Sequence, residues 1–275
     1  MTEDHGVGDE VLIRMDGAVA WIVLNRPQAR NALTLPQRLH ISATLDRFSG
    51  DPSVRSVVLT GSGGSFCAGA DLRAFEEPPT RPPGAPERIP GDLARRQKTA
   101  GQIVTAAILD CEKPVICALN GVAAGLGAQV ALACDLVIAA RDARLIEIFT
   151  RRGLVPDAGG TYLLSRLVGI HQAKQILMFG DDISAEEALA LGLVNAVVDP
   201  DELEATATAW ASRLAAGATR TLALTKWLVN RAFDTDRATS FDDEAVAVEL
   251  NMHSHDADEG VAAFIERREA KFLGW

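Results

Sequence analysis

The sequence lacks a hydrophobic run long enough to cross a membrane. One of its longest apolar stretches, residues 130–140, is interrupted by Asp135 and is shorter than the roughly 20 residues that a spanning helix requires. The first residues also lack the basic segment followed by an apolar one that marks a secretory signal. We therefore expect a cytoplasmic protein that makes no membrane contact.

Paired cysteine motifs are missing as well. The four cysteines are Cys67, Cys111, Cys117 and Cys134. None is spaced as Cys-x-x-Cys, and each has apolar or small neighbours, which predicts buried free thiols rather than disulfides or a metal site. His253 and His255 lie near acidic residues in a polar stretch, which is more typical of a solvated turn than of metal ligands. No metal site is predicted.

Positive charge is scarce. The formal net charge of −10 disfavours binding to nucleic acid or to anionic membranes, so an anionic ligand would need a local basic cluster. The chain also lacks a Gly-x-Ser-x-Gly elbow, a Walker phosphate loop and a Gly-x-Gly-x-x-Gly segment after a first strand. These absences remove the simplest hydrolase, nucleoside-triphosphatase and dinucleotide-binding interpretations.

The sequence does contain two loops of small residues, each preceded by a β-branched run. The first loop spans residues 61–72 and the second spans residues 120–127. Gly and Ala let a backbone approach a ligand closely, and a helix start presents unpaired N–H groups, so two such loops can hold one developing oxyanion. The alternative is that small residues only pack tightly where a strand meets a helix.

Length and composition predict a globular protein with one large core. The 275 residues are 48% hydrophobic and 23% charged. We expect residues 1–200 to form an α/β core and residues 201–275 an α-helical region that packs on the core or on another subunit. Residues 77–91 contain six prolines and are predicted to form a surface loop.

Local patterns predict most of the individual elements. Asp16-Gly17 between two apolar runs indicates a β-hairpin, and Ser184 followed by Glu187 indicates a capping box. Further strands are expected over residues 54–60, 114–119 and 135–140. Helices are expected over residues 35–48, 97–109, 126–134, 161–167, 202–215, 221–233, 241–252 and 256–271.

Four segments in this order resemble one known family. They are LNRPQARNAL (24–33), FCAGADL (66–72), NGVAAGLGAQVALACD (120–135) and RRGLVPDAGGT (151–161). Together they closely resemble the crotonase superfamily, the enoyl-CoA hydratases and isomerases. The resemblance implies an α/β spiral of ββα units with an α-helical C-terminal region, assembled as a homotrimer or as a hexamer of two trimers. It also implies an acyl-CoA thioester substrate and no tightly bound cofactor.

The resemblance assigns roles to particular positions. The backbone N–H groups of Ala70 and Leu126 match the two donors that hold the thioester oxygen. Arg30 and Lys271 match positions that could contact phosphates, although both could also be solvated surface cations. The full set of positions that match the CoA contacts is Ala29, Arg30, Ala68, Asp71, Leu72 and Lys271.

The chain departs from the family at the two acid/base positions. Hydratases of the family use two glutamates, and the matching residues here are Gln129 and Phe149. An amide cannot act as a general base and a phenyl ring carries no exchangeable proton, so hydration by a glutamate pair is not expected. Asp157 matches the acid/base position of some isomerases, but it could instead cap the helix that follows. Glu147 is a weaker candidate, because it lies two residues before Phe149 and could point to the other face of an extended segment. This objection does not apply if residues 144–150 are helical.

We therefore expect an enzyme that stabilises a thioester enolate and shifts the double bond of an enoyl-CoA. Asp157 would transfer the proton between C4 and C2, and burial would raise its pKa towards the working pH. The alternatives are hydration without the glutamate pair, a non-catalytic acyl-CoA-binding protein, and a CoA thioester hydrolase.

Overall fold

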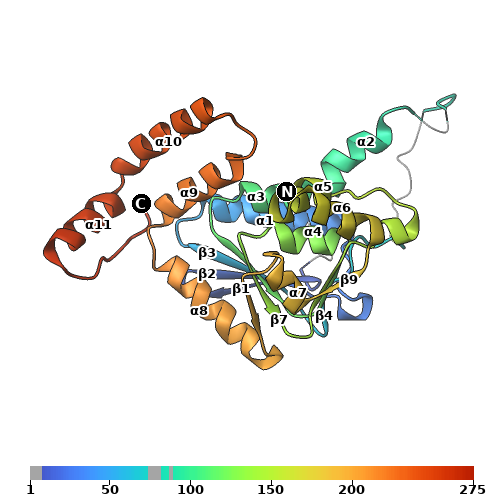
Figure 1. The fold of residues 1–275 in the computed structure, drawn as a ribbon, viewed down its shortest axis with the longest axis horizontal. Coiled ribbons are helices and arrows are strands. Elements are labelled where there is room, and N and C mark those ends of the chain that lie inside the picture. The colour runs from blue at the N-terminus through green and yellow to red at the C-terminus, as the bar shows by residue number, and fades with distance from the viewer. Residues whose placement is uncertain (1–7, 74–81, 87–88) are drawn as a thin grey trace.

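The computed structural model describes residues 8–73, 82–86 and 89–275. Two sheets form the centre of the molecule, with helices on both sides, and the last helices extend away from this body (Figure 1). No helix in the described ranges is both long and apolar enough to cross a membrane. Much of the predicted surface loop at residues 77–91 lies outside the described residues, and its described parts contain neither helix nor strand.

The larger sheet has six strands in the order β1-β2-β3-β5-β7-β10. They are β1 (Val11–Asp16), β2 (Val19–Leu24), β3 (Ser56–Gly61), β5 (Val115–Leu119), β7 (Leu136–Ala140) and β10 (Ala196–Val198). β1 and β2 form the predicted antiparallel hairpin, and the remaining pairs are parallel. Every residue of β5 is buried, as expected for a central parallel strand that is covered on both faces.

The smaller sheet has four strands in the order β4-β6-β8-β9. They are β4 (Ser65–Cys67), β6 (Val122–Ala124), β8 (Arg144–Ile146) and β9 (Asp182–Ser184). β3, β5 and β7 in the larger sheet are each followed directly by a strand of the smaller one. The chain therefore passes from the larger sheet to the smaller sheet three times in successive turns of a spiral. The predicted spiral of ββα units is confirmed.

Helices of the core begin at the expected signals. α1 (Leu35–Gly50) starts with a capping box between Thr34 and Gln37, and α7 (Ala185–Ala190) starts with the predicted box between Ser184 and Glu187. The helix predicted over residues 97–109 is divided. Its first turn, Gln97–Gly101, is π-helical and follows α2 (Asp92–Arg96), and α3 (Ile103–Asp110) continues it. The other core helices are α4 (Leu126–Ala133), α5 (Gly160–Val168) and α6 (Ile170–Phe179).

The C-terminal region is helical, as predicted. α8 (Leu203–Ala215) packs against β3, β5 and β7 of the larger sheet. α9 (Thr219–Arg231), α10 (Arg237–Met252) and α11 (His255–Glu266) lead away from it, and α10 and α11 project from the body (Figure 1).

The bounds of the last three helices were predicted wrongly. α9 begins and ends two residues before its predicted bounds. α10 starts before residue 241 because Asp236 caps it by accepting hydrogen bonds from two backbone N–H groups. The helix predicted to reach Lys271 ends at Glu266, because Arg267 adopts a left-handed conformation with φ 58° and closes the helix. The last residues then fold back, and the carboxylate of Asp256 accepts hydrogen bonds from two of their N–H groups.

The four cysteines are buried free thiols, as predicted. Burial raises the pKa of Cys67 to about 12, which makes this thiol unreactive.

Candidate active site

The two loops of small residues meet at the start of α4. A methyl group added to Gly69 would lie 2.8 Å from the carbonyl oxygen of Ala124 and 3.7 Å from the backbone nitrogen of Leu126. Gly69 has φ 106°, a backbone conformation that favours glycine. The close approach of the first loop to the second therefore depends on the missing side chain at this position.

One backbone N–H group from each loop remains available. Leu33 forms a parallel bridge with Ala70 in which the N–H groups of Leu33 and Asp71 donate, which leaves the N–H of Ala70 outside the bridge. Leu126 is the first residue of α4, and its cap residue offers no side-chain acceptor. Neither N–H donates a hydrogen bond to another described residue. Two orphan donors thus lie on loops in contact, at the positive end of a buried helix.

The small residues also allow tight packing, so the two interpretations of these loops are compatible. A methyl group added to Gly127 would overlap the carbonyl group of Cys67 in β4. All eight residues of α4 are buried. The same small residues let α4 pack closely against β4 and leave the N–H of Leu126 without an acceptor among the described residues.

Gln129 and Glu147 form a buried pair one helical turn beyond these donors. Gln129 is 0% exposed and Glu147 2% exposed, and the Gln129 Nε2 donates a hydrogen bond of 2.6 Å to Glu147 Oε2. Burial is the main cause that raises the pKa of Glu147 to about 7; the amide of Gln129 lowers it, and the charge of Asp157 raises it further.

Glu147 was set aside for a reason that was wrong, because residues two apart in an extended segment lie on the same face. The segment is also not extended as far as Phe149, since β8 ends at Ile146 and the backbone of Phe149 is helical. Both side chains are buried, with exposed fractions of 2% for Glu147 and 7% for Phe149. The Phe149 ring instead lies beside Gly125, where an added methyl group would be 3.7 Å from it.

Asp157 is half-buried in the loop before α5 and does not cap that helix. Gly159 is the capping residue, and no side chain bonds to the first turn. The carboxylate of Asp157 instead accepts a hydrogen bond of 3.0 Å from Gln97 Nε2, so the capping interpretation was wrong. Burial raises the pKa of Asp157 above its ordinary value, while the Gln97 amide and the charge of Arg38 act in the opposite direction.

Two glycines bring the Asp157 loop close to the polar pair. A methyl group on Gly160 would lie 2.7 Å from Gln129 Nε2, and one on Gly159 would lie 3.2 Å from Thr105 Cγ2. The first turn of α5 therefore contacts both α3 and the side chain of Gln129.

Unsatisfied polar atoms are concentrated around this loop. Eight buried side-chain polar atoms of the described residues have no hydrogen-bond partner. Half of them belong to the groups just described: Gln97 Oε1, Thr105 Oγ1, Gln129 Oε1 and Glu147 Oε1. Buried polar atoms are normally satisfied, so such a concentration indicates a place where a ligand or water completes the hydrogen bonding.

The predicted CoA-binding positions lie partly together. The N–H of Ala68 donates to the carbonyl of Arg30, which joins the segment at residues 29–30 to that at residues 68–72. The side chain of Arg30 is exposed, and its backbone is left-handed with φ 50°. Asp71 forms an ion pair of 3.0 Å with Arg26, which fixes its orientation. Leu72 is 45% exposed beside it.

Lys271 lies elsewhere, in the tail after α11. Its backbone N–H donates to Glu259 Oε1 at 2.7 Å, and its side chain is exposed. The structure therefore brings together all of the predicted CoA-binding residues except this one.

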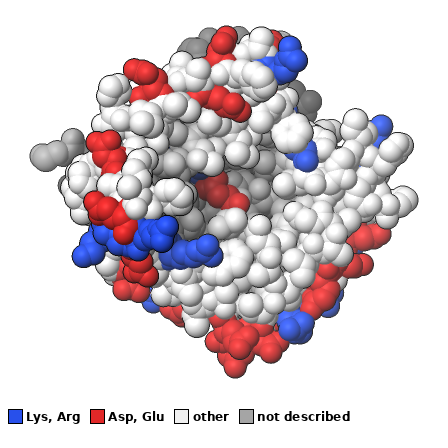
Figure 2. Space-filling model, turned by 60° about the vertical axis from the view of Figure 1, so that its left-hand side comes forward, with Lys and Arg blue, Asp and Glu red and all other residues white. Residues whose placement is uncertain are grey.

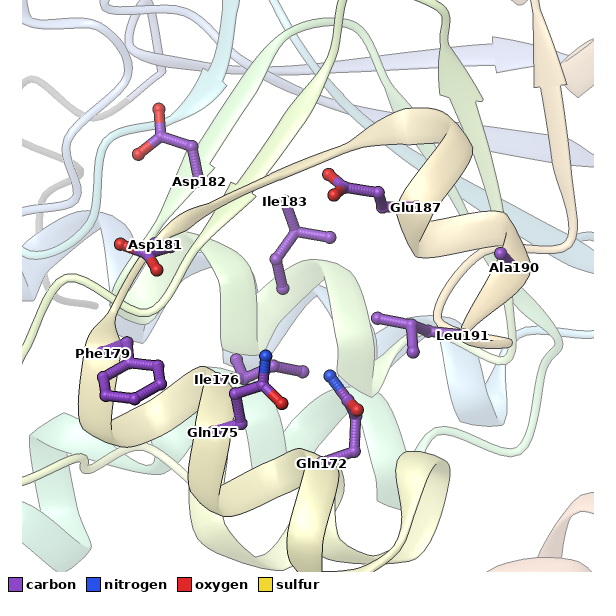
Figure 3. A pocket seen from close by; sticks show the side chains of 10 residues that line it. All are labelled: Gln172, Gln175, Ile176, Phe179, Asp181, Asp182, Ile183, Glu187, Ala190 and Leu191. Atoms are coloured by element: carbon purple, nitrogen blue, oxygen red, sulfur yellow. The ribbon is translucent and has the colours of Figure 1, made fainter.

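The surface contains other hollows. Figure 2 shows one face hollowed at its centre, with acidic side chains in the hollow and basic side chains gathered on part of its rim. A cavity of about 360 Å³ lies between α6, β9 and α7 and is lined by Gln172, Phe179 and Asp181 among others. Figure 3 shows the side chains that line it. None of the predicted site residues lines this second cavity.

Sequence reasoning missed Gln97 and set Glu147 aside. Gln97 lies 60 positions before Asp157 in the chain, and nothing in the local sequence links the two. Glu147 could have been kept as a candidate, because residues two apart in an extended segment lie on the same face.

Comparisons with known proteins give matches over almost the whole chain. Residues 14–274 match the family model described as enoyl-CoA hydratase/isomerase. The chain is 37% identical to 1,2-epoxyphenylacetyl-CoA isomerase of Escherichia coli strain K12, over 96% of this chain and 98% of that protein. It is 36% identical to crotonyl-CoA hydratase of Syntrophomonas wolfei, over 96% and 98% of the two chains. A crystal structure of enoyl-CoA hydratase from Mycobacterium smegmatis superposes with a TM-score of 0.85 at 34% identity, covering 96% of this chain and 98% of the other.

Proposed function

Because this chain belongs to the enoyl-CoA hydratase/isomerase family, we propose that it moves the double bond of an enoyl-CoA through a thioester enolate. The observation that carries the proposal is the arrangement around the two loops. The N–H donors of Ala70 and Leu126 lie on the two loops without described acceptors. The carboxylate of Asp157, which accepts a hydrogen bond from Gln97, lies in the loop before α5. The likeness to both isomerases and hydratases leaves the reaction to be argued from the residues.

The N–H groups of Ala70 and Leu126 would hold the thioester oxygen. Negative charge develops on this oxygen when the substrate loses a proton, and donors already in place need no reorganisation to stabilise it. Removing one such donor in an enzyme costs on the order of 10²–10³ in rate. Because backbone groups supply both donors, the side chain at position 126 matters little for this step.

Asp157 would move the proton. Its carboxylate takes a proton from C2 of a 3-enoyl thioester, and the electron pair moves onto the thioester oxygen to give the dienolate. The same carboxyl group then returns the proton to C4, which leaves the double bond between C2 and C3 and restores the carboxylate of Asp157. One group suffices because no water is added. The raised pKa of Asp157 favours this exchange.

Hydration is disfavoured by the residues at the two family positions. Gln129 is bound to Glu147 and cannot accept a proton, and Phe149 has none to exchange. Hydration by another arrangement, thioester hydrolysis and binding without turnover remain the competing functions, and each would give different products.

CoA would lie along the exposed edge formed by residues 29–30 and 68–72, with the cation of Arg30 near a phosphate. Lys271 would contribute a second cation, from its place in the C-terminal tail. No tightly bound cofactor is required, because the chemistry uses only the thioester and a carboxylate.

We also propose that the chain assembles as a homotrimer or as a dimer of trimers. Large apolar side chains on the projecting helices are open to solvent: Phe241, Phe264 and Ile265 are 61%, 85% and 72% exposed. Apolar patches of this kind on a folded surface mark contacts with other chains. Sedimentation velocity should give three or six chain masses, and a single chain mass would exclude the assembly.

The reaction is tested by supplying a 3-enoyl-CoA and a 2-enoyl-CoA separately and identifying the products. We expect the 3-enoyl ester to be isomerised, and Asp157→Asn to lower kcat by at least about 10²-fold while CoA-ester binding is retained. Asp142→Asn, at an exposed turn, is the matched control. Hydration without isomerisation, release of free CoA, or binding with no turnover by the unaltered protein would each refute the proposal.

A further inference from the structure

Glu147 is a buried carboxyl group that the proposed proton transfer does not use. Among the residues that the structure describes, its carboxyl group has a single hydrogen bond, from Gln129 Nε2, and its Oε1 has no partner. No ion pair joins it to a cation of the described part of the chain. A carboxylate in such a place would lose its hydration without compensation, which strongly disfavours the charged form.

Burial also raises the pKa of Asp157, but its surroundings counteract this more than those of Glu147 do. Asp157 is only half-buried, accepts the amide of Gln97 and feels the charge of Arg38. Its negative charge faces Glu147 and opposes a second charge there. The cation of Arg151, four residues after Glu147, forms ion pairs with Asp181 and Asp182. Burial therefore disfavours the charged form more strongly at Glu147 than at Asp157.

Resting on the proposed function, we propose that Glu147 is a positioning residue that works in its protonated form. As a neutral acid it accepts the hydrogen bond of Gln129 and fixes that amide against Gly160, at the start of α5. It also leaves Asp157 as the one negative charge beside the thioester. Ionisation of Glu147 would place a second charge next to both the base and the developing enolate.

The proposal predicts a loss of activity on the alkaline side of neutrality. The pKa of Glu147 is raised to about 7, chiefly by burial, so its neutral form predominates below this pH and declines above it. For a single group with this pKa, kcat/KM should fall about 30-fold between pH 6 and pH 8.5. The fall would come from Glu147, because Asp157 acts as a base in its ionised form, so its own titration gives a rise with pH and not a fall.

Glu147→Gln tests the idea directly. Glutamine cannot ionise, yet its carbonyl can still accept the hydrogen bond of Gln129. We expect kcat/KM for a 3-enoyl-CoA to remain within about threefold of the unaltered protein at pH 6 and to stay level up to pH 8.5. Glu147→Leu removes the acceptor and should lower kcat at every pH. Glu202→Gln, on the exposed surface, should keep the alkaline fall.

A second measurement does not depend on turnover. The side-chain carboxyl signal that disappears in Glu147→Gln can be followed by ¹³C NMR in the substrate-free protein. A titration midpoint near 7 is expected, and a midpoint in the ordinary range of about 4.3 would overturn the proposal. An alkaline fall that persists in Glu147→Gln would also overturn it. If neither ester is isomerised by the unaltered protein, the proposed function fails, and the NMR titration still decides the protonation state of Glu147.

Discussion

Replacing Gly69 with alanine should separate the two loops that hold the thioester oxygen. The new methyl carbon would lie 2.8 Å from the carbonyl oxygen of Ala124. Carbon and carbonyl oxygen normally stay about 3.3 Å or more apart, so the loops must part by about 0.5 Å. The φ of 106° adds backbone strain on the order of 1–3 kcal/mol.

Gly69→Ala should lower kcat strongly and Tm only slightly. A shift of this size moves the N–H of Leu126 out of line with that of Ala70, and losing one donor costs on the order of 10²–10³ in kcat. The strain should lower Tm by only a few degrees, since 1 kcal/mol corresponds to about 2–4 °C in a protein of this size. Stopped-flow kinetics with a 3-enoyl-CoA and thermal unfolding would measure both.

Gly17→Ala is the matched control for this variant. Gly17 also has a positive φ, at 56°, but nothing lies within 4 Å of an added methyl group. It should show a similar loss of Tm with kcat unchanged. If Gly69→Ala folds and keeps the kcat of the unaltered protein, the two loops do not act together on the thioester, and the assignment of the donors is refuted.

Two further predictions concern the carboxylate and the assembly. In Gly101→Ala the new methyl group would overlap Gln97 Oε1 and displace this side chain from Asp157, which raises the pKa of Asp157 and should move the acidic limb of kcat/KM to higher pH. Phe264→Asp, on the exposed face of α11, should reduce the sedimenting mass to that of smaller assemblies while the far-UV circular dichroism is retained.

Gly50→Ala serves as the control for the first of these variants, because an alanine there would meet no atom within 4 Å. Its pH profile should match that of the unaltered protein, and an unshifted acidic limb in Gly101→Ala would show that Gln97 does not tune Asp157. For the second, an unchanged mass in Phe264→Asp would place the contact elsewhere.

The sequence allowed the fold to be predicted because its local patterns agree with the tertiary arrangement. The hairpin at Asp16-Gly17 and the capping box at Ser184 are confirmed, and each depends on neighbouring residues only. The end of α11 was missed for a physical reason. Arg267 adopts a left-handed conformation although arginine has no preference for it, and the hydrogen bonds of the folded-back tail decide the boundary.

The candidate site could be predicted only in part. The donor loops were visible because small residues recur within each loop. The partners of the carboxyl groups were not, since Gln97 reaches Asp157 across 60 positions and Gln129 reaches Glu147 across 18. Such contacts depend on how the ββα units pack against one another, and no pattern of neighbouring residues in the sequence indicates this packing. The assigned roles of Asp157 and of the two N–H donors remain predictions.

The construction of the oxyanion donors from backbone amides has a consequence for how this protein can change over generations. Every residue except proline supplies a backbone N–H, so single substitutions at residue 126 leave the hydrogen-bond donor to the thioester oxygen in place. The residues that would decide the reaction are side chains, on α4, after β8 and before α5, and each can be replaced separately. Such a molecule can acquire a new reaction by point mutation while it keeps its hold on the same class of substrate.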